Sequence, residues 1–343
     1  MSRRAVFPSR LRLTAILPLL SAVAATGLVG ATPAHAATIT CTVNGVPVSG
    51  STINGTEGDS EIICPAIPRG VTVNGGGGNN TIKVNVGGAQ YEVGNRGTIN
   101  AGRGDDVIIV VGGSGAADGA PGLAGNTGEI YGGGGNETVT VIGGNGAKGQ
   151  DSRHSTWGNC GDGGRGGIGN DGHISAHGTI AVTGGNGGKG GDASGFQDCD
   201  GGHGGDGNND RIIGSGTGST VRTVGGDGGD GQSTGEGGNG GHGNDGHITI
   251  DKGVAGTEAV RALGGNGGTG GRTGNTYGGG GGEGADGNNR TIDIHTAGTA
   301  YVRGGNGGDG HPGGTGGKGN DGTVTTVPAG NYQAPGGTDG RSY

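Results

Sequence analysis

Gly-Gly-x triplets dominate the second half of the chain and restrict its backbone more than any other feature. Residues 184–191 and 264–271 both follow the pattern Gly-Gly-Asn-Gly-Gly-x-Gly-Gly. A period of three residues is that of the polyproline II helix. Collagen shares this period but needs proline-rich triplets, and only 10 prolines accompany the 100 glycines. The triplets therefore predict polyglycine II arms, whose bare backbone edges can approach and hydrogen-bond to neighbouring arms.

The apolar residues favour strands over helices. Beyond residue 36 the chain has 20 Ile and 21 Val, but leucine only at Leu123 and Leu263. β-Branched residues are typical of strands, and glycine is a poor helix former, so we expect almost no helix. Between residues 50 and 142, β-branched clusters recur about every nine to ten residues, with Gly/Asn/Asp turns between them. This pattern fits a sandwich, a barrel or a solenoid, and the repeated turn chemistry favours the solenoid.

A longer repeat begins near residue 143. The sequence Gly-Gly-Asn/Asp-Gly follows a β-branched segment at five nearly evenly spaced positions: Gly143, Gly184, Gly225, Gly264 and Gly304. Such a steady period indicates an architectural repeat. The predicted fold is all-β, a parallel β-solenoid or β-roll core with repeats of about 40 residues that carry polyglycine II arms. Because ordering glycine costs much backbone entropy, disordered linkers are the alternative for the arms.

Three turns in the first half share a second motif. They read Gly-Gly-Gly-Asn-Asn80-Thr-Ile, Gly-Arg-Gly-Asp-Asp106-Val-Ile and Gly-Gly-Gly-Asn-Glu137-Thr-Val. This motif resembles the nonapeptide of the calcium-binding RTX β-roll. The resemblance implies that Asn80, Asp106 and Glu137 face calcium. The motifs are widely and unequally separated along the chain instead of in tandem, so purely structural turns are the other interpretation.

The first 36 residues have the pattern of a secretory signal peptide. Arginines precede an apolar stretch, and Ala34-His35-Ala36 predicts cleavage after Ala36. The remaining chain would carry 17 basic and 29 acidic side chains. This acidic balance argues against nucleic acid as a partner. No second long apolar stretch follows, so we expect no transmembrane segment after cleavage and a secreted protein, free or loosely attached to the cell wall.

The glycine arms also carry a family resemblance. Gly-Gly-x arms broken by short strands, over residues 143 to 322, resemble the glycine-rich PGRS region of the mycobacterial PE-PGRS proteins and other polyglycine II bundles, such as certain phage tail adhesins. The resemblance implies a cell-surface location and an interaction role. This chain departs from that family in having a signal peptide and a cysteine-containing β-rich region in place of the helical PE domain.

Four cysteines in a secreted chain predict two disulfides, for which three connectivities exist. Cys41 with Cys64 would close the N-terminal region. Cys160 and Cys199 lie one repeat period apart in similar glycine-rich contexts. Because equivalent positions of adjacent repeats lie side by side in a solenoid, we predict that Cys160 and Cys199 join consecutive repeats.

Candidate catalytic or metal-binding residues are few. His203 and His242 occupy arm positions in neighbouring repeats, and His173 and His247 share the context Gly-Asn-Asp-Gly-His-Ile. Stacked histidines could bind zinc or copper, although repetition of a solvent-facing residue explains them equally well. A β-helical polysaccharide-active enzyme needs a cleft with carboxylates and a base. Aromatic residues that stack on sugars are scarce, and the large ones, Trp157 and Phe196, are expected to cap neighbouring arms.

These patterns predict five regions: a signal peptide (1–36), a disulfide-closed β-rich N-terminal module (37–70), a β-solenoid segment with RTX-like turns (71–142), glycine-rich repeats (143–327) and a flexible tail (328–343). The expected function is that of a non-enzymatic structural or adhesive protein of the cell envelope or extracellular matrix. Its partners would be surface polymers or other proteins, with no cofactor. The alternatives are a calcium-responsive binding module, the polysaccharide-active enzyme and, with few threonines in its arms, an ice-binding protein.

Overall fold

The structure is a computed structural model that describes residues 37–87, 92–152, 159–193, 197–273, 276–327 and 331–343. By their contacts the residues divide into Met1–His35 and Ala36–Tyr343, a division one residue from the predicted cleavage site. The second unit is all-β, and its described residues contain no helix. Nowhere in that described part is there a helix with the length and hydropathy needed to span a bilayer.

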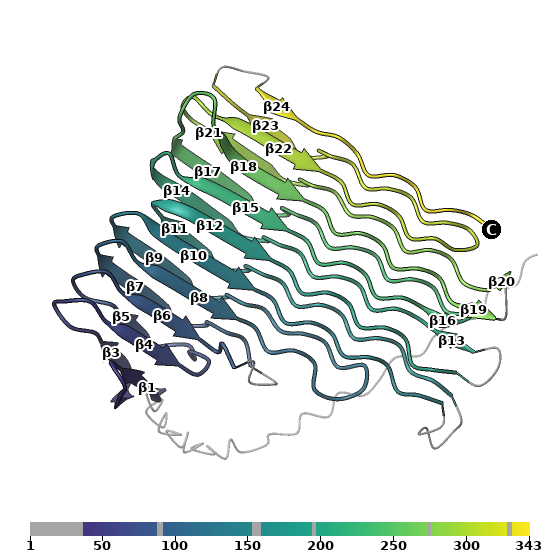
Figure 1. Ribbon diagram of the computed structural model, residues 1–343, viewed down its shortest axis with the longest axis horizontal. Coiled ribbons are helices and arrows are strands. Elements are labelled where there is room, and N and C mark those ends of the chain that lie inside the picture. Colours follow the sequence, from purple (N-terminus) through teal and green to yellow (C-terminus); the bar gives the residue numbers. More distant parts are fainter. Residues whose placement is uncertain (1–36, 88–91, 153–158, 194–196, 274–275, 328–330) are drawn as a thin grey trace, which may run out of the picture. The chain divides into compact units, whose positions relative to one another are not determined.

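Two large sheets form the core of this unit (Figure 1). The first sheet has eleven strands in the order β2 (Val46–Gly50), β1 (Ile39–Val43), β4 (Glu61–Cys64), β6 (Thr81–Val84), β8 (Val107–Val111), β10 (Glu137–Ile142), β12 (Gly178–Thr183), β15 (Thr220–Val224), β18 (Glu258–Leu263), β22 (Thr299–Arg303) and β24 (Tyr332–Gln333). The second has nine, in the order β23 (Thr323–Thr325), β21 (Thr291–Ile294), β17 (His247–Lys252), β14 (Arg211–Thr217), β11 (His173–Ala176), β9 (Glu129–Gly134), β7 (Thr98–Arg103), β5 (Thr72–Asn74) and β3 (Thr52–Asn54). From β3 and β4 onward every pairing within these sheets is parallel, as a solenoid requires.

The core is a column of β-branched side chains between the sheets. Along most strands of the two sheets buried and outward-facing residues alternate, as they do in β6 and β11. Ile62, Ile82 and Ile108 are paired in successive coils and are fully buried. A shift of one residue would turn such a set to solvent, so the alternation fixes the register of every coil.

Successive coils have different lengths, although their strands remain in register. The sequence interval between partners lengthens with each coil along the paired series Ile62, Ile82, Ile108, Val139 and Ile180. The additional residues leave the solenoid as glycine-rich loops between the two sheets. The RTX-like turns are therefore stacked in consecutive coils, contrary to the expectation from their spacing that they are isolated.

The glycine-rich loops form a second body that we call the glycine slab. Outgoing arms follow strands of the eleven-stranded sheet, and return arms lead back to the nine-stranded sheet (Figure 1). The outgoing arms are 112–115, 143–149, 184–191, 225–231, 264–271, 304–310 and 334–342, and the return arms are 119–125, 160–169, 199–207, 235–243, 278–287 and 313–319. Near the tips, β13 (Asp198–Cys199) pairs with β16 (Gln232–Ser233), and β19 (Arg272–Thr273) pairs with β20 (Thr276–Tyr277).

Two of the expected regions are continuous with the solenoid and the slab. Residues 37–70 do not form a separate module, because β3 and β4 are already strands of the solenoid. The described residues of the expected flexible tail, 331–343, contain β24 and the last outgoing arm. Gly337 and Gly340 in this arm donate backbone hydrogen bonds to Gly317 and Gly314. Part of the segment expected to be a flexible tail therefore belongs to the glycine slab.

Candidate functional site

The glycine slab is held together by backbone hydrogen bonds that repeat every three residues. In the arm 184–191 the first glycine of each triplet donates to the next coil along, as Gly187 N does to Asp227 O of the next outgoing arm at 2.8 Å. The second glycine donates to the preceding return arm, as Gly185 N does to Gly167 O at 2.7 Å. Each arm is thus bonded within its own layer and to the opposite layer. The slab therefore consists of two hydrogen-bonded layers of polyglycine II helices.

The packing leaves no room for a β-carbon on either glycine. A Cβ at Gly184 would overlap the carbonyl oxygen of Gly205, and one at Gly185 would overlap that of Gly144. The obstructing atoms belong to backbone that is itself hydrogen-bonded, so no side chain can rotate away. In arms such as 184–191, 225–231 and 264–271 only the third, or x, position of each triplet carries a side chain, and the x side chains lie on the faces of the slab. Other arms have exceptions at the second position, such as Leu123, Ala147 and Ala285.

On the outgoing face the x side chains form a bonded row. Asn186 N donates to Asn145 Oδ1 at 2.9 Å, and Asp227 N donates to Asn186 Oδ1 at the same distance. Asn266 N donates to Asp227 Oδ1, and Asn306 N to Asn266 Oδ1. We call these five residues the outgoing row. Because each side-chain oxygen is bonded, the rotamers are fixed and the side chains have a regular spacing.

The return face has similar rows of mixed charge. In one of them His242 N donates to Asp206 Oδ1, Asp286 N donates to His242 Nδ1, and Lys318 N donates to Asp286 Oδ1. His203 lies in a different row, where its Nδ1 accepts from Asn239 N. These histidines are therefore not stacked on one another, contrary to the arrangement that a zinc or copper site would need.

The other two candidate histidines are also apart. In the nine-stranded sheet Arg211 is the paired neighbour of His247 and occupies the coil between His173 and His247. The described residues contain no group of three or more His, Cys, Asp or Glu side chains arranged to hold a metal ion.

A buried asparagine ladder joins the slab to the solenoid. Each member donates its side-chain Nδ2 to the Oδ1 of the next at 2.7 to 2.8 Å, and all but the last are fully buried. The members are Asn95, Asn126, Asn170, Asn208, Asn244, Asn288 and Asn320. The sequence signal for this ladder is a Gly-Asn pair before each strand of the nine-stranded sheet from β7 onward, and from Asn170 onward it is followed by Asp or Asn. Its bonds hold every return arm in register as the arm enters the solenoid.

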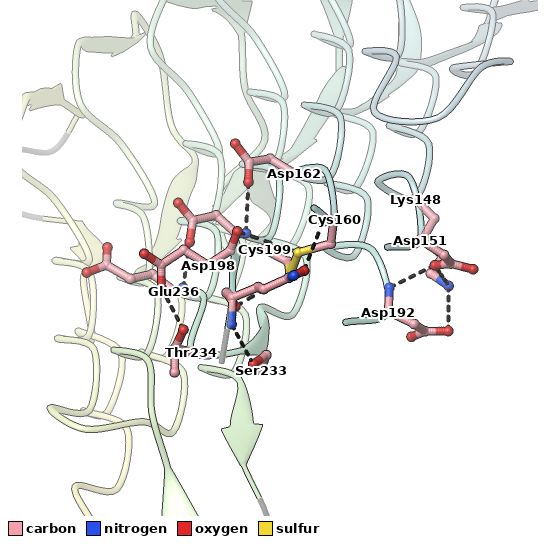
Figure 2. Close-up of a disulfide and its surroundings, with 12 residues drawn as sticks. Lys148, Asp151, Cys160, Asp162, Asp192, Asp198, Cys199, Ser233, Thr234 and Glu236 are labelled. Atoms are coloured by element: carbon pink, nitrogen blue, oxygen red, sulfur yellow. Dashed lines mark hydrogen bonds and ion pairs between the residues drawn. A yellow bond between two sulfur atoms is a disulfide. The ribbon is translucent and has the colours of Figure 1, made fainter. Parts of the chain in front are cut away.

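Both predicted disulfides are present. Cys41 and Cys64 link β1 to β4, with their Cα atoms 4.3 Å apart. Cys160 and Cys199 link the beginnings of two adjacent return arms, with their Cα atoms 5.8 Å apart (Figure 2). Around the second disulfide, Asp200 N donates to Asp162 Oδ1 and Thr234 Oγ1 donates to Asp198 Oδ1. The disulfide therefore anchors these two return arms at the ends that lie away from the core strands.

Ion pairs join two of the outgoing arms near their tips. Lys148 Nζ lies 2.6 Å from Asp151 Oδ1 and 2.9 Å from Asp192 Oδ2 (Figure 2). The hydrogen bonds to these two carboxylates raise the pKa of Lys148. Trp157 and Phe196, which we expected to cap the arms here, lie outside the described residues.

The three residues predicted to face calcium lie together inside the solenoid. Asn80, Asp106 and Glu137 are each only 1% exposed. Asn80 Oδ1 accepts from Ser60 N, Asp106 Oδ1 accepts from Asn80 N, and Glu137 Oε2 accepts from His177 N. Two carboxylate oxygens, Asp106 Oδ2 and Glu137 Oε1, have no partner. Calcium takes six to eight oxygen ligands, and these two carboxylate oxygens are too few, so the arrangement favours structural turns. Measuring the thermal unfolding temperature at increasing calcium concentrations tests the calcium alternative.

Burial raises the pKa of Asp106 and of Glu137, whose carboxyl groups also repel each other. A raised folded-state pKa means that the folded chain binds the proton more tightly than the unfolded chain does. Stability should therefore increase as the pH falls from neutrality through the raised pKa toward about 4.5, the ordinary value for Glu.

Glu137→Gln should increase the free energy of unfolding at pH 7 by about 1 kcal/mol, because the amide retains an acceptor for His177 N without a buried charge. Urea unfolding between pH 4.5 and 8 measures this effect, and the variant should show a weaker pH dependence. Glu129→Gln on an exposed position is the matched control, with no expected change. A loss of stability in Glu137→Gln at pH 7 would contradict the interpretation.

One surface hollow bears on the enzyme alternative because it brings several charged side chains together. This hollow of about 450 Å³ beside the nine-stranded sheet is lined by six charged or titratable residues: Arg69, Arg96, Glu129, Asp171, His173 and Asp210. Burial, with repulsion from Asp210, raises the pKa of Asp171, and burial together with Arg211 lowers the pKa of His173. Among the described contacts, however, none joins His173 to a carboxylate that would orient it as a base.

Comparisons with known proteins assign no family. No family model matches the chain, and no curated protein matches it. Among solved structures, an antifreeze protein of the springtail Granisotoma rainieri, described as a bundle of nine polyproline type II helices, is similar with 21% identity over 68% of this chain and 94% of that chain. The TM-score is 0.14, which does not establish a shared fold.

Proposed function

We propose that the protein is a secreted, non-enzymatic structural or adhesive protein of the cell envelope or extracellular matrix, and that the faces of its glycine slab bind an extended polymer. The observation that carries the proposal is the outgoing row, in which side-chain oxygens of successive arms are fixed by backbone N–H groups. A surface of this kind presents many similar polar contacts in a constant order.

The row retains hydrogen-bonding capacity for a ligand. The Nδ2 groups of Asn145, Asn186 and Asn306 have no partner among the described residues, so they can donate outward. Arms that continue parallel strands repeat at roughly 4.8 Å, and triplets repeat at roughly 9 Å along each arm. A polymer with regularly spaced hydroxyl or carbonyl groups could bind several amides at once, and many weak contacts then give high total affinity.

Charge narrows the class of polymer. The whole chain has a formal net charge of −8, and acidic residues such as Asp227 and Asp230 stand among the amides of the slab. Polyanions would be repelled by this surface. A neutral polysaccharide therefore fits better than an acidic one. The two disulfides agree with an oxidising compartment such as the cell exterior.

Sedimentation with insoluble chitin or cellulose tests the proposal. The double variant Asn145→Asp/Asn306→Asp retains the Oδ1 acceptors that hold the arms and replaces two outward amide donors by carboxylate oxygens. We expect it to bind at least 10-fold more weakly than the unaltered chain, because each lost polar contact costs about 1 kcal/mol or more. Binding by the unaltered chain to neither polysaccharide would argue against the proposal.

The nine-stranded sheet supplies a matched control. Its outward face has a short asparagine row in which Asn74 Nδ2 donates to Asn54 Oδ1 and Asn100 Nδ2 donates to Asn74 Oδ1. Asn54→Asp/Asn100→Asp changes the net charge equally without altering the slab, and it should bind like the unaltered chain. Equal losses in both double variants would point to net charge instead of the outgoing row.

A further inference from the structure

The last outgoing arm, 334–342, departs from the rule that the other arms follow. Its x residues Thr338 and Arg341 align with Asn306 and Asp309, since their N–H groups donate to those side chains. Asp339 therefore occupies the position equivalent to Gly307. In the arms from 143 to 310 this position in each triplet is glycine. The last arm has Gly336, Asp339 and Ser342 there.

Glycine at this position faces the following return arm. A Cβ at Gly307 would overlap the carbonyl oxygen of Gly314, and one at Gly304 would overlap that of Gly317. At Gly336, by contrast, a Cβ would come no closer than 3.4 Å to Gly317 O. No described arm packs on that side of the last arm. The side chains of Asp339 and Ser342 thus stand where a further polyglycine II helix would have to lie.

The carboxylate of Asp339 also replaces one bond that such a helix would make. Along the return layer, Gly204 N donates to Asn239 O, Gly240 N to Glu283 O and Gly284 N to Thr315 O, each at 2.8 to 2.9 Å. The equivalent group in the last return arm is Gly316 N. It donates to Asp339 Oδ1 at 2.9 Å.

We propose that Asp339 is a cap that closes the last edge of the glycine slab against an added Gly-Gly-x segment. Without this side chain, the edge is a docking groove that fits one kind of partner. The partner must be an extended Gly-Gly-x strand, because it has to approach the backbone of both last arms as closely as the internal arms approach one another. This role concerns the end of the slab and is independent of the polymer-binding faces.

The groove offers both kinds of backbone group to such a strand. Gly316 N would be released as a donor once Asp339 is removed. Elsewhere the carbonyl of the second glycine in each outgoing arm accepts from a return arm, as Gly185 O does from Gly205 N. Gly337 O and Gly340 O, the equivalent groups in the last arm, have no such backbone donor among the described residues. An added strand can therefore be bonded on two sides.

Binding of a fluorescent peptide (Gly-Gly-Asn)4 to the full chain tests the cap. Asp339→Gly/Ser342→Gly should bind the peptide at least 10-fold more tightly than the unaltered chain, measured by fluorescence anisotropy. Asp339→Asn retains an acceptor for Gly316 N and a Cβ, so it should behave like the unaltered chain. Thr338→Gly adds a glycine at an x position of the same arm and should also leave binding unchanged.

Hydrogen exchange gives a second measurement that does not depend on the peptide. In Asp339→Ala the amide of Gly316 should exchange at least 10-fold faster than in the unaltered chain, while Gly284 keeps its protection. Concentration-dependent dimers of the double glycine variant, seen by sedimentation, would also support the proposal, with a second copy as the source of the strand. Unchanged peptide binding in the double glycine variant, or unchanged exchange at Gly316 in Asp339→Ala, would overturn it.

Discussion

Gly226→Ala is expected to lower the free energy of unfolding by more than about 3 kcal/mol, which is large for a change of one methyl group. The added Cβ would overlap the carbonyl oxygen of Gly185. Gly226 N also donates to Gly205 O at 2.8 Å, so moving the arm away would break a bond to the opposite layer. Urea or thermal unfolding followed by circular dichroism measures the loss.

Gly336→Ala is the matched control for this effect. It lies in the last outgoing arm, where a Cβ meets only Gly317 O at 3.4 Å, and it has no positive φ angle. Alanine restricts the unfolded chain, so this variant should be neutral or up to about 0.5 kcal/mol more stable. Similar destabilisation by both substitutions would show that the arms are not packed through bare backbone edges.

Local sequence was sufficient to predict much of the architecture. The period of three in segments such as 184–191 has one regular backbone solution, and alternating β-branched residues such as Ile82 and Val84 have only one buried face. The pairing of Cys160 with Cys199 followed from the register of adjacent repeats, and the structure confirms it. Each of these features is repeated within a short segment, so it can be recognised without knowledge of the distant parts of the chain.

The features that the sequence did not predict depend on how segments of different length align in space. Asn80, Asp106 and Glu137 are separated by unequal intervals in the sequence, yet they stack because the extra residues leave the core as loops. Likewise the last arm lies in the segment that we expected to be a flexible tail, and it departs from the Gly-Gly-x pattern because Asp339 and Ser342 replace glycines that are needed only beneath a further arm. Spacing alone does not distinguish a longer loop from a broken repeat.

The asparagine ladder provides the second strong test, because it is the polar element on which the register between slab and solenoid depends. Asn208 Oδ1 accepts from Asn170 Nδ2, and Asn208 Nδ2 donates to Asn244 Oδ1, both at 2.8 Å. Asn208→Ala would leave one N–H of Asn170 Nδ2 and one lone pair of Asn244 Oδ1 unpaired in the core, although Asn170 Nδ2 still donates to Gly172 O and Asn244 Oδ1 still accepts from Gly246 N. At about 1–3 kcal/mol for each unpaired group, we expect a loss of about 3–5 kcal/mol in the free energy of unfolding.

Asn186→Ala separates this effect from the loss of an amide in general. Asn186 belongs to the outgoing row, is exposed, and accepts a single backbone N–H, from Asp227, through Oδ1. Water can replace that bond, so this variant should lose about 1 kcal/mol or less. Urea unfolding of the two variants under the same conditions measures the difference. Equal losses in the free energy of unfolding for Asn208→Ala and Asn186→Ala would mean that water reaches the ladder. The register of the return arms would then depend on the glycine backbone alone.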